Sequence, residues 1–542
     1  MRSNNVKMKA NKLTFRQYMA FSLIYSKYLA ENKIPSISEL KEVIGFKSDR
    51  MLNITLNALE KKGLIEYRQG KIKIKDEILN YSNLIDPLMV TKKYLTYNEI
   101  KKEVSKITGH RTNSTKKFNP KPIQLELSND KDLIKYLNNE KEVFHRWYTF
   151  LEDYPPSLVY DKLKEFDVKK GSVVLDPFVG SGTTLVTSKL FGMNVIGIDA
   201  NPVAAFVSKV KITWDIDLSK LKEFINKILE DYECALPLLE KIRLKTDFTE
   251  SMGFIELHQW LKPRVQNEVA FLKERISEIE DSPEKDLLKL ALIEAAVESS
   301  NVSFCPGTSF YPFRKRPAFI DSFKKKLEIV IEDLVVIQKL RMNDKLGEVE
   351  SVIFNNDCRE STKYIDKSSI DFILTSPPYP NDLEYTRQTR LEMYLLDYVK
   401  DIKDVRKIKR RMVKGSTKLI FKDSNSEKYV KKFNSVQKVA NQIARALQDR
   451  KWGWDYPRMV REYFGDMYLA LKEFYELLKD EGYCLLVVGD QTYKKVLIPV
   501  AKILSEIGED IGYSTQEIQL YRIRRSTIHN IPLPEEILVL RK

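Results

Sequence analysis

The sequence has few of the residues that bind metals or form disulfides. Its 542 residues include four cysteines and four histidines. The cysteines form no Cys-x-x-Cys pair, which argues against a disulfide framework and against a zinc knuckle. The histidines show no His-Glu-x-x-His spacing. We therefore expect reduced cysteines and neither a structural nor a catalytic metal. The eight residues are Cys234, Cys305, Cys358, Cys484, His110, His145, His258 and His529.

Long apolar runs are also lacking. No stretch approaches the roughly 18 apolar residues that are needed to cross a bilayer. The N-terminal segment MRSNNVKMKANKLTF is basic but lacks the apolar core of a signal peptide. With 43% hydrophobic and 31% charged residues, the composition is that of a soluble globular protein. We expect a cytoplasmic protein without membrane contact, and the length predicts several domains.

Positive charge, in contrast, is abundant and unevenly distributed. The net charge is +15, and residues 1–120 hold 24 Lys and Arg against 11 Asp and Glu, an excess of 13. Residues 401–450 hold 15 against 5, an excess of 10, so the rest of the chain is net acidic. Two separate basic regions favour a polyanionic partner that is held at two places.

The N-terminal region has the pattern of a small helical domain. Apolar residues recur at helical spacing over residues 13–32, and Ser36 with Glu39 predicts the start of a short second helix. A third helix is expected over Asp49 to Lys61, followed by two alternating runs, LIEYR and KIKIK. This order resembles a winged helix-turn-helix, with the third helix as the recognition helix. A module used only for dimerisation or packing is the alternative.

From Gly171 onward, strand and helix patterns alternate, which predicts a parallel sheet with helices on its faces. The series stops near Asp215 and resumes near Glu348, so the helical stretch between them is interpreted as an insertion. The predicted divisions are a winged-helix-like domain (1–80), a linker (81–142), two halves of one α/β domain (143–213 and 348–542) and the insertion (214–347).

One motif follows the first predicted strand of the α/β domain. In VVLDPFVGSGTTL, an acidic residue, Asp176, ends the strand, and Gly180 and Gly182 precede a helix. Glycines allow a sharp turn and a close approach to a ligand at the carboxyl end of a strand, where nucleotides bind in open α/β sheets. Asp199 ends the next predicted strand, from which a carboxylate can hold ribose hydroxyls.

A second motif, ILTSPPYP, ends the predicted strand Ser369 to Leu374. Proline cannot donate to a sheet ladder and has a fixed φ, so two prolines in sequence form a stiff backbone whose carbonyls stay free. This strand end therefore presents rigid hydrogen-bond acceptors beside an aromatic ring.

Together, Asp176 to Thr184 and Thr375 to Tyr379 resemble the motifs of S-adenosylmethionine-dependent DNA amino-methyltransferases. The resemblance implies a Rossmann-like fold, S-adenosylmethionine as cofactor and double-stranded DNA as partner. A weaker likeness covers HRWYTFLEDYPPSLV, residues 145–159, which corresponds to a segment that closes on the methionine end of the cofactor. The residues expected at the cofactor are Asp176, Pro177, Phe178, Gly180, Gly182, Thr183, Thr184, Asp199, Asn201, Asp357 and Thr375; those expected to be catalytic are Ser376, Pro377, Pro378 and Tyr379.

The reaction of this family gives the second motif a purpose. An exocyclic amine is a poor nucleophile because its lone pair is delocalised into the base. The resemblance implies that Ser376 Oγ and the Pro377 carbonyl accept the amine hydrogens while Tyr379 stacks on a base that is flipped out of the duplex. A serine before Pro-Pro-Tyr favours cytosine N4, although it does not exclude adenine N6. Asp357, at the end of a strand, is interpreted as an acceptor for the adenine amine of the cofactor or as an ordinary cap.

Three alternatives remain open from the sequence: an adenine N6 methyltransferase, an RNA amino-methyltransferase, and a DNA-binding regulator with an inactive catalytic domain. Cytosine C5 chemistry is excluded, because it requires Pro-Cys and Cys305 stands in the order Cys-Pro. Base recognition is assigned either to the insertion, through Arg314, Lys315 and Arg316, or to Lys414 to Lys451. A restriction-modification system with a cognate restriction endonuclease is the expected context.

Overall fold

The structure is a computed structural model that describes most of the chain. The described residues are 13–46, 48–68, 70–79, 88, 93–108, 118, 120, 143–148, 154–251, 254–304, 309–311, 314–342, 348–449, 453, 455–526 and 530–542. The chain divides into two compact units. The first comprises residues 1–121, 216–331 and 394–401, and the second comprises residues 122–215, 332–393 and 402–542. In the described ranges, no helix is both long and apolar enough to span a membrane.

The first unit begins with a small three-helix core. Helices α2 (Phe15–Glu31), α3 (Ile37–Ile44) and α4 (Asp49–Lys61) precede the antiparallel pair β1 (Ile65–Arg68) and β2 (Lys71–Ile74). The Ser36 side chain caps α3 by accepting from the Glu39 backbone N–H at 3.1 Å, and Gly45 ends that helix in the left-handed region with φ 70°. These elements lie where the sequence pattern predicts them, while their use as a winged helix on DNA stays a prediction.

The predicted linker 81–142 contains regular structure. Strand β3 (Tyr94–Thr96) pairs in parallel with β6 (Arg243–Lys245), and helix α6 (Tyr97–Thr108) packs on α11 (Leu218–Leu239). Ile100 and Val104, one turn apart, form the buried stripe of α6. The pattern is short and set among lysines, so it is weak in the sequence.

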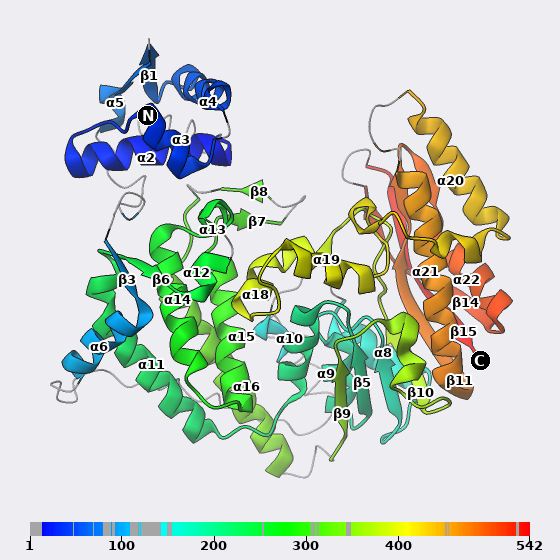
Figure 1. The fold of residues 1–542 in the computed structure, drawn as a ribbon. Helices are drawn as coiled ribbons and strands as arrows, with labels where there is room; N and C mark the ends of the chain where they lie inside the picture. Colours follow the sequence, from blue (N-terminus) through cyan, green and yellow to red (C-terminus); the bar gives the residue numbers. More distant parts are fainter. Residues whose placement is uncertain are drawn as a thin grey trace. The chain divides into compact units, whose positions relative to one another are not determined.

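The predicted insertion is mainly helical. Besides α11, it holds α12 (Asp247–Ser251), α13 (Phe254–Trp260), α14 (Pro263–Ser277), α15 (Pro283–Glu298) and α16 (Phe319–Met342), with the short pair β7 (Val302–Ser303) and β8 (Ser309–Phe310). Helices α11, α14 and α15 contact one another (Figure 1). Arg314 and Lys315 are exposed, whereas Arg316 donates to the Val302 carbonyl.

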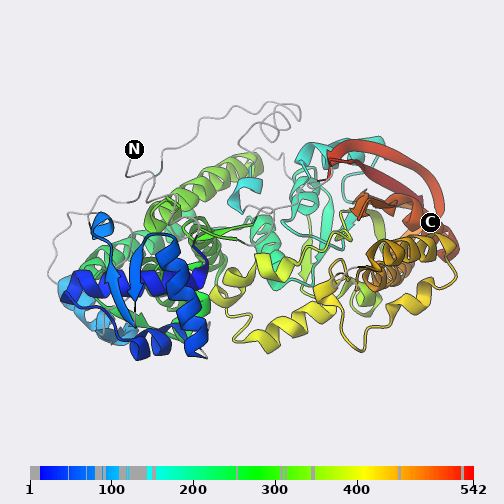
Figure 2. The ribbon, with the colours of Figure 1, turned by 90° about the horizontal axis from the view of Figure 1, so that it is seen from above.

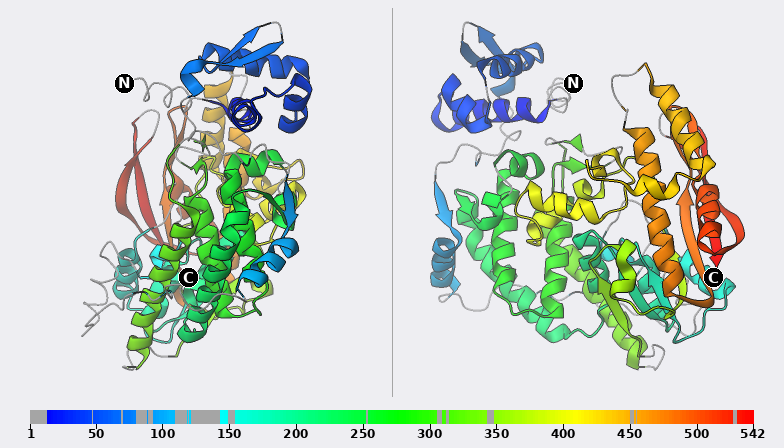
Figure 3. Two further views of the ribbon diagram at one scale, coloured as in Figure 1. Left: turned by 90° about the vertical axis from the view of Figure 1, so that its left-hand side faces the viewer. Right: turned by 45° about the vertical axis from the view of Figure 1, so that its right-hand side comes forward.

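The second unit is built on a seven-stranded sheet in the order β14-β15-β11-β10-β4-β5-β9. Its strands are β4 (Val173–Asp176), β5 (Asn194–Ile198), β9 (Ser351–Phe354), β10 (Ile370–Thr375), β11 (Leu478–Gly489), β14 (Ser514–Arg525) and β15 (Pro532–Arg541). All pairings from β9 to β11 are parallel, and β15 is antiparallel to both of its neighbours. This arrangement confirms the parallel sheet that the alternating pattern predicts and the Rossmann-like fold that the resemblance implies. The views from above and from the sides show β14 and β15 as two long neighbouring strands at one edge (Figures 2 and 3).

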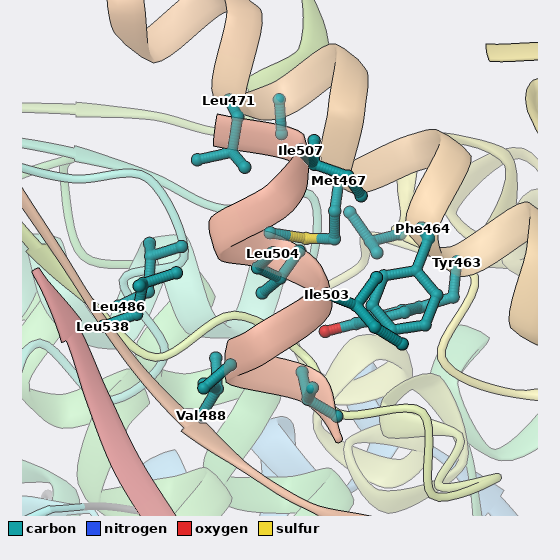
Figure 4. Close-up of a cluster of buried hydrophobic side chains, with 14 of the residues drawn as sticks. Tyr463, Phe464, Met467, Leu471, Leu486, Val488, Ile503, Leu504, Ile507 and Leu538 are labelled. Carbon is teal, nitrogen blue, oxygen red and sulfur yellow. The ribbon is translucent and has the colours of Figure 1, made fainter. Parts of the chain in front are cut away.

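Helices cover both faces of this sheet. On one face, α8 (Pro156–Glu165) packs through Leu158, Val159 and Leu163 on alternate residues of β11 and β15. On the other, α21 (Tyr456–Leu477) and α22 (Val500–Ile511) enclose a second buried apolar cluster. Figure 4 shows Ile503, Leu504 and Ile507 of α22 between the aromatic and aliphatic side chains of α21 and the strand residues Leu486 and Leu538.

The helices and strands that remain are short or lie outside the main sheet. The first unit adds α5 (Asp76–Leu79). The boundary between the two units falls within α18 (Arg390–Leu395). The second unit adds α9 (Thr183–Leu190), α10 (Pro202–Ile212), α17 (Tyr385–Gln388), α19 (Ile402–Arg411), α20 (Asn434–Leu447), β12 (Gln491–Tyr493) and β13 (Val496–Ile498). Short 3-10 turns cover His145–Trp147, Cys358–Lys363, Thr417–Leu419 and Ser426–Val430.

Candidate active site

The candidate site is a pocket at the carboxyl ends of β4, β5 and β10. The chain runs from β4 outward through β5 to β9 and then returns to the other side of β4 with β10, so the strand order reverses between β4 and β10. Ligands bind at such a switch point in open α/β sheets. The pocket, together with the open space at its mouth, comprises about 860 Å³ that is not filled by atoms. Its lining includes Tyr154, Asp176 to Ser181, Thr183, Asp199 to Asn201, Ala204, Cys358, Ser376 to Tyr379, Tyr385 and Arg411 to Val413.

Asp176 joins the ends of β4 and β10. Its carboxylate Oδ1 accepts from Thr375 Oγ1 at 2.5 Å and from the Phe178 backbone N–H at 3.1 Å. Thr184, in the first turn of α9, donates to the Leu374 carbonyl at 3.2 Å and also bonds to the Tyr154 hydroxyl. Asp176 is 2% exposed, and burial raises its pKa to about 7 although the hydrogen bonds from Thr375 and Phe178 oppose this. The site therefore holds a carboxyl group that gains from a nearby positive charge.

Asp199 ties β5 to the glycine loop. One carboxylate oxygen accepts from the Gly180 N–H at 3.0 Å and the other from the Asn201 N–H at 2.8 Å. Each oxygen keeps a lone pair for a ligand hydroxyl. Burial raises the pKa of Asp199 to about 6, and the two backbone hydrogen bonds limit the shift. Asn201 caps α10 by accepting from the Val203 N–H at 3.1 Å.

Position 182 requires glycine for two reasons. Its φ is 88°, in the left-handed region that side chains avoid, and a Cβ would lie 3.0 Å from Ser208 Oγ. The same Ser208 hydroxyl donates to the Gly180 carbonyl at 3.0 Å. The loop is thereby held tightly against α10, with Thr183 buried at the start of α9.

The second motif lines the same pocket. Ser376, Pro377 and Pro378 follow β10 directly, and the Ser376 hydroxyl lies 3.4 Å from the Tyr379 hydroxyl. Tyr379 is 6% exposed, with its hydroxyl in the interior, so little more than the pocket-facing part of the ring is open to a base. Burial and the nearby Glu535 raise the pKa of Tyr379, which keeps the phenol protonated at neutral pH. Its stacking role stays a prediction.

The end of α19 and the residues that follow it close one side of the pocket. Arg411, Met412 and Val413 belong to the lining, and the next residue, Lys414, is buried with its ammonium 2.8 Å from Asp466 Oδ1 on α21. Asp466 is fully buried and also pairs with Arg359 Nη1 at 2.7 Å. Lys414 therefore anchors the segment in the core, and it is not itself among the exposed residues of the proposed recognition stretch Lys414 to Lys451.

Asp357 lies beside the pocket, with its carboxylate engaged. Arg359 Nε donates to Oδ1 at 2.9 Å and Arg359 Nη2 to Oδ2 at 2.7 Å, while the Arg359 backbone N–H also reaches Oδ1. Its neighbour Cys358, which is buried, belongs to the lining, and Asp357 does not. In the structure, Asp357 caps the turn that follows it. Its contact with the cofactor stays a prediction.

Comparisons with known proteins agree with this geometry. A family model described as DNA methylase matches residues 27–209. The Type II methyltransferase M.BsoBI of Geobacillus stearothermophilus is 24% identical over 441 residues, which cover 73% of this chain and 83% of the relative. M.MvaI of Kocuria varians, also a Type II methyltransferase, is 25% identical over 409 residues, which cover 71% of this chain and 85% of the relative.

The chain is therefore similar to DNA methylases over residues 27–209 and to Type II methyltransferases over most of its length. These findings support a site-specific DNA methyltransferase that uses S-adenosylmethionine as its methyl donor.

Most residues that the sequence indicates do meet in the methyltransferase pocket. All belong to the lining except Gly182, Thr184 and Thr375, which support it from behind, and Asp357, which is engaged by Arg359. Pattern analysis missed the lining residues Tyr385, Arg411 and Val413, because none of them lies in a motif. Of the segment 145–159, residues 149–153 lie outside the described part of the chain, as does Cys305.

Proposed function

We propose that this methyltransferase transfers the methyl group to N4 of cytosine in duplex DNA, and that one pocket holds both the cofactor and the target base. The observation that carries the proposal is that Ser376 and Pro377 line the same pocket as the two strand-end carboxylates, Asp176 and Asp199. The groups that accept the amine hydrogens and the groups that hold the cofactor therefore line one pocket. A base and a cofactor bound by them are close enough to react.

The residues present fit S-adenosylmethionine. The cofactor carries positive charge at its methionine end and ribose hydroxyls near its centre. Burial raises the pKa of Asp176, so a positive charge beside this carboxyl favours its ionised form, which suits the positive end of the cofactor. Asp199 has free lone pairs on both oxygens and suits the ribose hydroxyls. The loop around Gly182, in which a Cβ has no room, suits a close approach of the backbone. When bound, S-adenosylmethionine supplies an electrophilic methyl group on a positively charged sulfur.

The chain's own residues then act on the base. Ser376 Oγ and the Pro377 carbonyl accept the two amine hydrogens, which draws the nitrogen lone pair out of conjugation with the ring and toward the methyl group. The prolines hold these acceptors in place before the base arrives, so little reorganisation remains for the reacting complex. The amine gains the methyl group and gives up one proton. Flipping the base costs a few kcal/mol, which contacts with the pocket offset.

Nucleoside mass spectrometry on DNA from cells that express the protein tests the target base. The proposal predicts N4-methylcytosine with the wild-type chain and its loss with Ser376→Ala. N6-methyladenine without N4-methylcytosine would establish the adenine alternative and overturn the choice of base while leaving DNA amino-methylation intact.

We further propose that the enzyme is the modification component of a restriction-modification system with a cognate restriction endonuclease. The names of the relatives as Type II methyltransferases support this role. Mapping the methylated sequence and challenging the modified DNA with an endonuclease of the same site specificity tests it. Complete cleavage of the modified DNA would contradict a protective role.

A further inference from the structure

The Tyr379 hydroxyl is the middle of a chain of polar groups that leads away from the pocket. Ser376 Oγ lies 3.4 Å from it on the pocket side, and Glu535 Oε1 of β15 lies 3.0 Å from it on the inner side. Glu535 is 3% exposed. Ser376 and Glu535 are thus linked through one phenol although 159 positions separate them in the sequence.

The direction of these hydrogen bonds follows from the acceptors. A phenol has one proton, and two acceptors lie within reach of the Tyr379 oxygen: Glu535 Oε1 at 3.0 Å and the Val487 carbonyl at 3.4 Å. The carboxylate is both nearer and charged, so it takes the proton. Arg522 and Arg524 of β14 pair with the same carboxylate and compensate its buried charge.

With its own proton on Glu535, the Tyr379 oxygen is free to accept. The group on its other side is the Ser376 hydroxyl, which has one proton and two lone pairs. When that proton turns toward Tyr379, both lone pairs remain for hydrogens of a substrate amine. A distance of 3.4 Å is long for such a bond, as is common in catalytic sites before the substrate closes them.

The surroundings fix the Tyr379 ring in this pose. The Arg524 guanidinium lies over the ring, 5.2 Å from its centroid. On β11, a Cβ at Gly489 would collide with Arg524 and come within 3.2 Å of the ring. The glycine therefore leaves the room that both side chains occupy.

We propose that Glu535 is a positioning residue that, through the Tyr379 hydroxyl, keeps Ser376 oriented as a hydrogen-bond acceptor. This inference rests on the proposed function, because the orientation matters only if Ser376 accepts hydrogens from the target amine. It also explains why the residue is a tyrosine, because stacking on a base needs only the ring and not the hydroxyl.

The test uses single-turnover methyl transfer from labelled S-adenosylmethionine to unmethylated genomic DNA, with enzyme in excess. Tyr379→Phe keeps the ring and removes the relay, and we expect the rate to fall roughly 10- to 100-fold, less than when a group that contacts the reacting atoms is removed. The dissociation constants of cofactor and DNA should stay within about 2-fold, because the hydroxyl does not bind either of them. Glu535→Gln, which keeps a neutral acceptor, should lower the rate by a smaller factor.

Tyr463→Phe is the matched control. Tyr463 is fully buried in the same core, and its hydroxyl has no hydrogen-bond partner among the described residues. Removing that hydroxyl should leave the single-turnover rate unchanged, whereas a general effect of a missing buried hydroxyl would lower it as well.

The double variant Tyr379→Phe with Glu535→Gln separates a relay from two structural effects. If Glu535 acts only through Tyr379, the double variant is as slow as Tyr379→Phe alone; independent effects multiply. Multiplied losses, or a wild-type rate for Tyr379→Phe, would overturn the inference and leave the proposed function standing. A wild-type protein that transfers no methyl group to any base would overturn both.

Discussion

Asp176 offers a sharp test of how the pocket holds a cofactor, because its buried carboxyl titrates near neutrality. Its pKa is raised to about 7 by burial, against 3.8 for the unperturbed group. A positive charge bound beside it favours the ionised form and lowers the pKa again. Binding of S-adenosylmethionine below pH 7 must therefore expel a proton, and the apparent affinity falls as the pH falls.

The size of the effect follows from this shift. If the bound cofactor returns the pKa of Asp176 to its ordinary range, the ratio of the dissociation constants at pH 6 and pH 8 depends on the protonated fraction of Asp176 in the free protein. That fraction makes the dissociation constant about 10-fold larger at pH 6 than at pH 8, or about 1.4 kcal/mol. Asp199, whose pKa is raised to about 6, is half protonated at pH 6 and adds at most about a 2-fold change there, so Asp176 dominates the window from pH 6 to 8.

Isothermal titration calorimetry with S-adenosylmethionine at half-unit steps of pH measures this directly. Asp176→Asn is the control, because the amide oxygen can still accept from Thr375 and Phe178 but the side chain has no charge to titrate. We expect weaker binding by this variant at pH 8 and a change of no more than about 2-fold between pH 6 and 8, which is the contribution of Asp199. A wild-type affinity that does not change over this window would refute the placement of the positive end of the cofactor at Asp176.

The free protein should show the opposite dependence. A carboxyl whose pKa is raised by folding stabilises the native state in its protonated form, so the contribution of Asp176 is fully present below pH 3.8 and is lost as the pH rises through about 7. The increase in Tm that the cofactor causes should therefore grow from pH 6 to pH 8. Differential scanning fluorimetry with and without cofactor measures it, and an increase that shrinks over this range would contradict the sign.

Three further predictions concern other parts of the chain. Asp466→Ala leaves Lys414 and Arg359 without their buried partner and should lower the free energy of unfolding by about 3–5 kcal/mol in urea denaturation, whereas a loss under about 1 kcal/mol would contradict the anchoring role. Gly182→Ala should lower Tm and weaken cofactor binding more than Gly171→Ala, because both glycines have positive φ but only a Cβ at 182 is crowded; equal effects would leave backbone strain as the whole cause. Removal of residues 1–78 should flatten the salt dependence of DNA binding, since each lost phosphate contact lowers the log-log slope by about 0.9, whereas an unchanged slope with altered sedimentation would favour a dimerisation module.

Most strands of the sheet could be predicted because they are local apolar runs that end at a turn signal. β4 and β10 are examples: both are largely buried, and their sequences are nearly continuous stretches of Val, Ile, Leu and Phe. The two carboxylates of the site were found for the same reason, since Asp176 and Asp199 end such runs. The pair β12 and β13 was missed, because three residues are too few for a recognisable alternation.

Contacts between distant residues could not be predicted. Nothing in the sequence near Tyr379 shows that its hydroxyl meets Glu535, because that contact depends on β15 pairing with β11. The same limit explains Lys414, which a charge count places with a basic surface and which the fold pairs with Asp466. Local pattern decides which residues end a strand, while the partners of a buried polar group depend on the register of strands that are far apart in the chain.

The position of β15 has a consequence for the order in which the enzyme becomes active. The second motif follows β10, whereas β15 comprises Pro532–Arg541, so the motif is synthesised long before the strand that carries Glu535. On a ribosome, a chain that already contains Ser376 and Tyr379 would still lack the carboxylate behind them. Full activity would then report that the sheet is complete.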